Sequence, residues 1–130
     1  MLHEEITSQI LAAFFAVYNQ LGYGFLEKVY ENAMIIELDK HGLKVTPQAS
    51  IQVCYDGKVI GDYYADLLVE DLVVIEIKAV EQIIKAHENQ LVNYLRAGHL
   101  EVGLLLNFGP EPQFKRKIFT HTRKPLMRNP

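Results

Sequence analysis

Several features that define whole classes of protein are scarce in this chain. It has a single cysteine, Cys54, so no internal disulfide can form and a disulfide-stapled secreted fold is excluded. Eight glycines and five prolines are too few for a linker or low-complexity protein. The longest apolar run, from Ile10 to Tyr18, is far shorter than the roughly 20 residues that span a membrane.

The N-terminal segment also lacks the basic residues of a signal peptide. Glu4 and Glu5 precede the apolar run, and no lysine or arginine occurs before Lys28. Together with the lone cysteine, this composition predicts a soluble cytoplasmic protein without a membrane segment.

Charge is distributed unevenly along the chain. Residues 1–112 hold all 16 acidic residues and 7 basic ones, whereas residues 113–130 hold 6 basic residues and no acid. A chain of 130 residues forms one domain, which we place at residues 1–120, with a basic tail at 121–130. The basic segment is either a solvated tail or an arm that contacts phosphates. The predicted nucleic-acid contacts in the second case are Lys115, Arg116, Lys117, Arg123 and Lys124.

Three segments have the apolar spacing of helices. Residues 4–21 carry apolar side chains three or four positions apart, and Gly22 ends this predicted helix. A third helix is predicted for residues 83–97. The second helix is predicted from Phe25 to Lys40, with an inner face of Leu26, Val29, Tyr30, Ala33 and Met34.

The remaining segments alternate like strands. Residues 51–55 and 58–69 predict a hairpin with a two-residue turn at Asp56-Gly57 and a bulge or bend at Gly61. Residues 72–80 begin with four apolar side chains, which predicts a central strand covered on both faces. A buried strand at 102–108 follows the third helix by a crossover, and a short edge strand is expected at 114–120. The order ααβββαβ predicts an α/β (α+β) fold with helices on the faces of a sheet.

Three charged residues interrupt the predicted sheet. Glu76 and Lys78 are two positions apart and project from the same face of the central strand, and Asp66 lies within the apolar part of the preceding strand. Such charges are costly unless they are paired or bind a metal. A buried structural ion pair would account for two of the three. Two carboxylates beside an ammonium group instead suit Mg²⁺, which would hold a scissile phosphate and activate a water.

The two acids can share a site in only some registers. With a two-residue loop at Glu70-Asp71, Asp66 would pair with Ile75 and face the opposite side of the sheet from Glu76. A shared site therefore requires an odd-numbered loop or a bulge between Asp66 and Glu76.

Polar residues on two predicted helices are further candidates. Glu27 falls on the inner arc of the second helix. It either interacts favourably with the helix dipole, as an acid in the first turn does, or belongs to a polar site. On the third helix, His87, Gln90 and Tyr94 form one polar and aromatic stripe. This stripe is either an ordinary half-buried face or a set of donors for a phosphate or a metal-bound water.

These residues resemble the motifs of a known family. Gly24-Phe25-Leu26-Glu27-Lys28-Val29-Tyr30 matches a GxxExxY signature, and three further motifs follow it in order: Ala65-Asp66, Glu76-Ile77-Lys78 and Gln90-Leu91-Val92-Asn93-Tyr94. Over about residues 4–120, the chain resembles the GxxExxY proteins, a group within the PD-(D/E)XK nuclease superfamily. One departure is Ala65, which replaces the proline of the "PD" element without removing a ligand.

The resemblance implies a fold and a site. The fold is a restriction-endonuclease-like PD-(D/E)XK core with a mixed central sheet flanked by helices. Carried over residue by residue, the resemblance makes Asp66 and Glu76 metal ligands, Lys78 the catalytic lysine, and Glu27 the helix-borne acid that some members add. Gln90 and Tyr94 resemble the QxxxY motif that lies beside the active site of RecB-like nucleases. Carboxylate ligands alone suit Mg²⁺, with Mn²⁺ as a substitute.

The predicted function is a Mg²⁺-dependent nuclease that hydrolyses phosphodiester bonds of DNA or RNA. The alternatives are a non-catalytic nucleic-acid-binding module on a nuclease fold and a protein-interaction module with a structural polar cluster. The intact set of Asp66, Glu76 and Lys78 favours hydrolysis, because a module without catalysis has no reason to keep buried charges. The acidic body argues against tight unaided binding to nucleic acid, so a partner protein could supply the binding surface.

Overall fold

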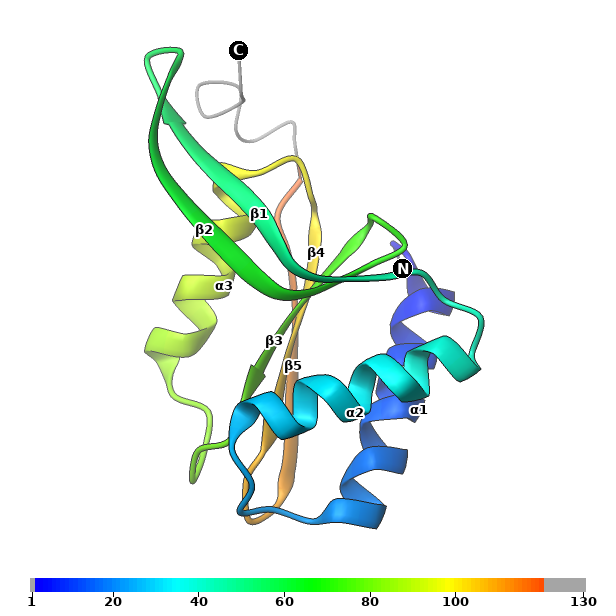
Figure 1. Ribbon diagram of the computed structural model, residues 1–130. Coiled ribbons are helices and arrows are strands. Elements are labelled where there is room, and N and C mark those ends of the chain that lie inside the picture. The colour runs from blue at the N-terminus through cyan, green and yellow to red at the C-terminus, as the bar shows by residue number, and fades with distance from the viewer. Residues whose placement is uncertain (1, 121–130) are drawn as a thin grey trace.

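The computed structural model describes residues 2–120, which form three helices and five strands (Figure 1). In chain order these are α1 (Glu4–Leu21), α2 (Glu27–Lys40), β1 (Val45–Tyr55), β2 (Lys58–Val69), β3 (Val73–Lys78), α3 (Lys85–Ala97), β4 (Val102–Phe108) and β5 (Pro112–Ile118). This order confirms the predicted ααβββαβ arrangement, followed by the expected edge strand. No helix in residues 2–120 is long and apolar enough to cross a membrane.

The five strands form one mixed sheet in the order β1-β2-β3-β4-β5. Strands β1, β2 and β3 are antiparallel neighbours, β4 runs parallel to β3, and β5 is antiparallel to β4. Helix α3 connects the parallel pair, because a strand that returns in the same direction needs a crossover. Strand β3 is thus the middle strand, and its residues 73–77 are all buried, as its apolar sequence predicts.

Helices cover both faces of the sheet (Figure 1). On one face, α1 and α2 pack over a core that includes Phe14 and Tyr30. On the other face, α3 packs Leu91 and Leu95 against Val74 and its neighbours. Alternate residues of β3 and β4 therefore enter two different cores, which is why these strands are apolar on both sides.

The hairpin of β1 and β2 follows its local sequence signals. Asp56 and Gly57 form the two-residue turn, and both have positive φ (53° and 74°), as a turn matched to strand twist requires. A register shift leaves Ile60 as an extra residue beside Gly61, which confirms the predicted bulge. The far half of the hairpin extends beyond the other strands (Figure 1).

The buried face of α2 differs from the prediction. Tyr30 and Met34 are buried as expected, but Leu26 is 81 % exposed and Val29 is 40 % exposed. Glu31 occupies a buried position instead. The helix begins at Glu27 and not at Phe25, and Leu26 precedes it as the N-cap in extended conformation, so Leu26 does not belong to the helical face. Glu31 is buried where it accepts a hydrogen bond from Gln48, a partner that apolar spacing does not reveal.

Candidate active site

The turn between β2 and β3 decides whether the two acids share a site. Val69 pairs with Val73, so the loop has three residues, 70–72. An odd-numbered loop places Asp66 opposite Glu76 on the same face of the sheet. The structure therefore meets the condition that the sequence imposed on a shared site.

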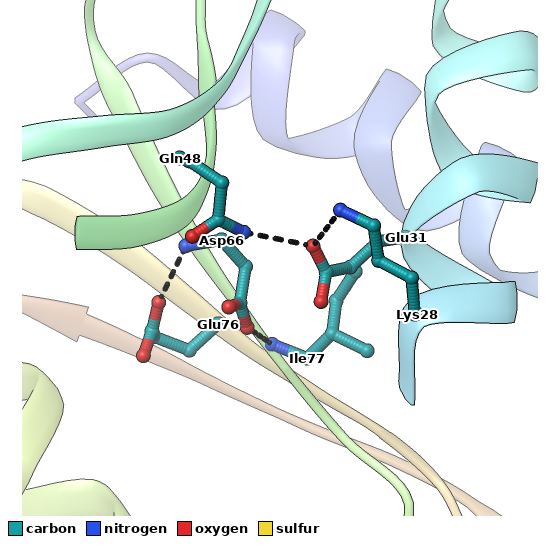
Figure 2. A network of polar contacts seen from close by, with 6 residues as sticks. All are labelled: Lys28, Glu31, Gln48, Asp66, Glu76 and Ile77. Atoms are coloured by element: carbon teal, nitrogen blue, oxygen red, sulfur yellow. Dashed lines mark hydrogen bonds and ion pairs between the residues drawn. The ribbon is translucent and has the colours of Figure 1, made fainter. Parts of the chain in front are cut away.

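The two strands separate at these acids. Regular pairing ends at Leu67 and Ile75. Beyond it, the main-chain N–H of Asp66 donates to Oε2 of Glu76 at 2.9 Å, and the N–H of Ile77 donates to Oδ2 of Asp66 at 2.7 Å (Figure 2). Side-chain carboxylates thus replace backbone acceptors at the fork where β2 leaves β3. Each carboxylate has a second oxygen that can bind a ligand.

Helix α2 brings two more carboxylates to this fork. Glu27, in its first turn, accepts a hydrogen bond at 3.2 Å from the N–H of Ala79, directly after β3. Glu31, one turn further on, is 7 % exposed and accepts a hydrogen bond from Nε2 of Gln48 at 3.0 Å. Nζ of Lys28 lies 3.7 Å from the same carboxylate (Figure 2). Glu27 was predicted as a site residue and Glu31 was not, although a spacing of four places both on one face of the helix.

Crowding and burial raise the pKa values of these acids. Burial, and second the charge of Asp66, raise the pKa of Glu76 to about 7. Burial also raises the pKa of Asp66, and burial together with the charge of Asp66 raises that of Glu31. Lys78, half-buried on the same face as Glu76, lowers the pKa values of Asp66 and Glu76 but does not offset these effects. The fork therefore carries an excess of negative charge that a bound cation would relieve.

The oxygen donors of the fork suit a hard cation. Among residues 2–120, no three His, Cys, Asp or Glu side chains gather closely enough to form a ready-made metal cluster. Asp66 and Glu76 fit Mg²⁺ or Mn²⁺ as a pair of oxygen donors. Glu27 accepts the hydrogen bond from the N–H of Ala79 through Oε2 and is not close enough to these two acids to complete a cluster of three within the described residues.

Buried Asn107 of β4 fixes the chain that follows Lys78. Its Oδ1 accepts a hydrogen bond from the N–H of Val80, and its Nδ2 donates to the carbonyl of Val80, both at 2.9 Å. Asn107 also pairs with Lys78 across the β3–β4 ladder. Nothing in the sequence around Asn107 predicts this role, because its partners lie far away in the chain.

Helix α3 packs on the face of the sheet that carries Val74, two residues before Glu76. Tyr94 is half-buried, and its ring stacks on that of Tyr63 in β2. Burial, and second the charge of Glu76, raise the pKa values of both tyrosines, so both lie within the field of the acids. Gln90, one turn before Tyr94, is exposed. The third member of the stripe, His87, accepts a hydrogen bond from the main-chain N–H at the start of α3.

Tyr63 is a third residue of this region, after Glu31 and Asn107, that the sequence did not single out. Its hydroxyl is buried and has no hydrogen-bond partner among the residues that the structure describes. A tyrosine in an apolar strand predicts only a core residue, so its position beside Tyr94 and Glu76 depends on the tertiary structure.

The predicted basic arm comprises residues 113–130, and two bases in its described part, 113–120, have partners within the protein. Nζ of Lys117 lies 2.6 Å from Oε1 of Glu88 on α3. Arg116 donates to a main-chain carbonyl near the N-terminus, and Lys115 is exposed on the same strand. Two further bases of the predicted arm lie outside the described residues: Arg123 and Lys124.

Comparison with known proteins agrees with this arrangement. The family model of the PD-(D/E)XK nuclease superfamily matches residues 4–118, a range that contains the whole fork and the five-stranded sheet. No curated protein and no solved structure matches the chain significantly. The match extends to the superfamily, and the narrower GxxExxY grouping stays a resemblance. The mixed sheet with helices on both faces is consistent with the restriction-endonuclease-like fold, and the chain belongs to the PD-(D/E)XK nuclease superfamily.

Proposed function

We propose that this protein is a metal-dependent nuclease that hydrolyses phosphodiester bonds of DNA or RNA. The observation that carries the proposal is the opposition of Asp66 and Glu76 across the β2–β3 fork, with Lys78 on the same face. Membership of a nuclease superfamily supports a nucleic-acid substrate.

We assign metal binding to Asp66 and Glu76, with Mg²⁺ as the expected ion and Mn²⁺ as its substitute. Such an ion polarises a phosphoryl oxygen and lowers the pKa of a bound water. The backbone hydrogen bonds to Oδ2 of Asp66 and Oε2 of Glu76 fix the orientation of both carboxylates. A fixed orientation lowers the cost of reorganising the site when it is loaded. Glu27 is our candidate for a third ligand.

We assign the remaining side chains of the fork to the substrate. The ammonium group of Lys78 stabilises negative charge that develops on the phosphoryl oxygens. Tyr94 and Gln90 are proposed donors on the α3 side, and the influence of Glu76 on the pKa of Tyr94 supports this role for the tyrosine.

We assign contacts with phosphates further from the fork to the basic arm. Exposed Lys115 is the described base best placed for a phosphate, because Lys117 and Arg116 have partners within the protein. The rest of the chain is acidic, so we propose that a partner protein supplies specificity. The single cysteine fits a reducing compartment such as the cytoplasm.

The test is a cleavage assay with matched lysine variants. Single- and double-stranded DNA and RNA are incubated with the protein and Mg²⁺, Mn²⁺ or EDTA. The wild type should cleave at least one substrate with metal and none in EDTA. Lys78→Ala should lose on the order of 100-fold or more in rate, and Lys58→Ala, at the exposed hairpin tip, should not.

Three outcomes would contradict the proposal. Undiminished cleavage by Lys78→Ala would remove the lysine from the chemistry, and cleavage in EDTA would remove the metal. Binding of nucleic acid without cleavage under any condition would instead favour the non-catalytic module.

A further inference from the structure

The loop between α1 and α2 exposes several large apolar side chains. Within residues 22–26, which we call the signature loop, Tyr23 is 61 % exposed, Phe25 is 47 % exposed and Leu26 is 81 % exposed. Single exposed apolar residues are ordinary, but a cluster of them beside a polar site marks a binding surface.

The signature loop is held rigidly despite its exposure. The hydroxyl of buried Tyr30 donates to the carbonyl of Gly22 at 2.7 Å and accepts from the N–H of Phe25 at 3.3 Å. The ring of Tyr30 stacks on Phe108 and meets Phe25 edge-on. Gly24 has a φ of 109°, where any side chain would be strained. The first and last residues of the GxxExxY signature therefore serve to fix the loop that carries the exposed rings.

The signature loop borders the candidate active site. The residue that follows it is Glu27, whose carboxylate contacts the N–H of Ala79 directly after β3. Lys28 follows in the same helical turn, with its side chain 65 % exposed. Glu27 thus links the end of the signature loop to the end of β3 and to the charge of Asp66.

We propose that Tyr23 and Phe25 form a stacking platform for unpaired bases of single-stranded nucleic acid at the active site. This inference rests on the proposed function, which it deepens by naming the substrate class. Rings that stack on bases bind without sequence preference, whereas the faces of bases within a duplex are already covered. A loop fixed before binding loses little conformational freedom on binding. Lys28 is paired with Glu31 at 3.7 Å, but its side chain is 65 % exposed, so its charge is also accessible to an adjacent phosphate.

Fluorescence can detect the stacking directly, because the chain has no tryptophan. In a Lys78→Ala background with Mg²⁺, Phe25→Trp introduces a single reporter that a stacked base should quench. Single-stranded oligothymidylate should quench it at saturation. An abasic strand with the same phosphates and a blunt duplex should not. Equal quenching by the abasic strand would overturn the proposal.

Affinity measurements provide the second test. The double variant Tyr23→Leu, Phe25→Leu keeps apolar bulk but removes both rings, and should bind single strands about 5- to 150-fold more weakly for each stacked base. The matched control replaces Tyr55 and Tyr64 with leucine, since these hairpin tyrosines are 72 % and 54 % exposed. It should bind as the Lys78→Ala parent does. Circular dichroism checks that all variants are folded.

The outcomes separate this inference from the proposed function. Cleavage by the wild type, together with unchanged single-strand affinity in the double variant, would overturn the platform alone. Quenching by single strands without any cleavage would support the platform and overturn hydrolysis. Loss of self-association in the double variant, with single-strand binding unchanged, would assign the loop to protein contacts and overturn the platform.

Discussion

Replacing Glu76 with glutamine should stabilise the metal-free protein at pH 8. The carboxylate is 8 % exposed, and its pKa is raised from 4.5 to about 7, first by burial and then by Asp66. Below pH 4.5, Glu76 is neutral in both the folded and the unfolded state. Between the two pKa values only the folded state keeps the proton, so the free energy of unfolding falls as the pH rises. The total loss is about 3 kcal/mol and is complete above pH 7.

A glutamine at position 76 cannot titrate, but it preserves the hydrogen bond to Asp66. Its Oε1 can accept the hydrogen bond that the N–H of Asp66 donates to Glu76. Glu76→Gln should therefore exceed the wild type by up to about 3 kcal/mol at pH 8, which raises Tm by on the order of 10 °C. The difference should vanish near pH 4.

The assay is urea or thermal unfolding in EDTA at several pH values between 4 and 8, followed by circular dichroism. Glu88→Gln is the control, because the hydrogen bond from Lys117 lowers the pKa of Glu88 and its removal should bring no gain at pH 8. A loss of about 3–5 kcal/mol in Glu76→Gln at pH 8 would refute the reasoning, since it would identify the carboxylate as part of a structural ion pair. Parallel pH profiles for Glu76→Gln and the wild type would refute the raised pKa.

Three further predictions concern the metal, the signature loop and the core. Mg²⁺ should raise the Tm of the wild type at pH 8 but not that of Glu76→Gln; an equal rise in both would argue against binding at the fork. Tyr30→Phe removes both hydrogen bonds to the signature loop and should cost about 1–3 kcal/mol in urea unfolding, whereas unchanged stability would mean that the loop is held by other contacts. Gly103→Ala would place a Cβ 2.8 Å from Cδ1 of Leu91, so calorimetry should record a loss of about 1–3 kcal/mol, and a neutral result would show that α3 moves easily.

Local patterns determined the elements of this fold. Apolar spacing predicted α1 and α3, and the Asp56-Gly57 turn and the bulge at Gly61 followed from the backbone preferences of a few neighbouring residues. The two-sided apolar sequence of β3 predicted its central place in the sheet. The apolar neighbours of Asp66 in β2 and of Glu76 in β3 marked both as charges that need a partner. The free-energy cost of burying a charge in a sheet depends little on the rest of the fold.

Only the tertiary structure decided how these charges meet. The three-residue turn at 70–72 placed Asp66 opposite Glu76, and a change of one residue in that loop would have separated them by the thickness of the sheet. Helix α2 began only at Glu27, which left Leu26 outside it, and Glu31 was buried beside Gln48, a polar partner from a distant part of the chain. Spacing along a sequence reports which side chains share a face. Which face meets which partner depends on packing between segments far apart in the chain, and that is where the candidate site is formed.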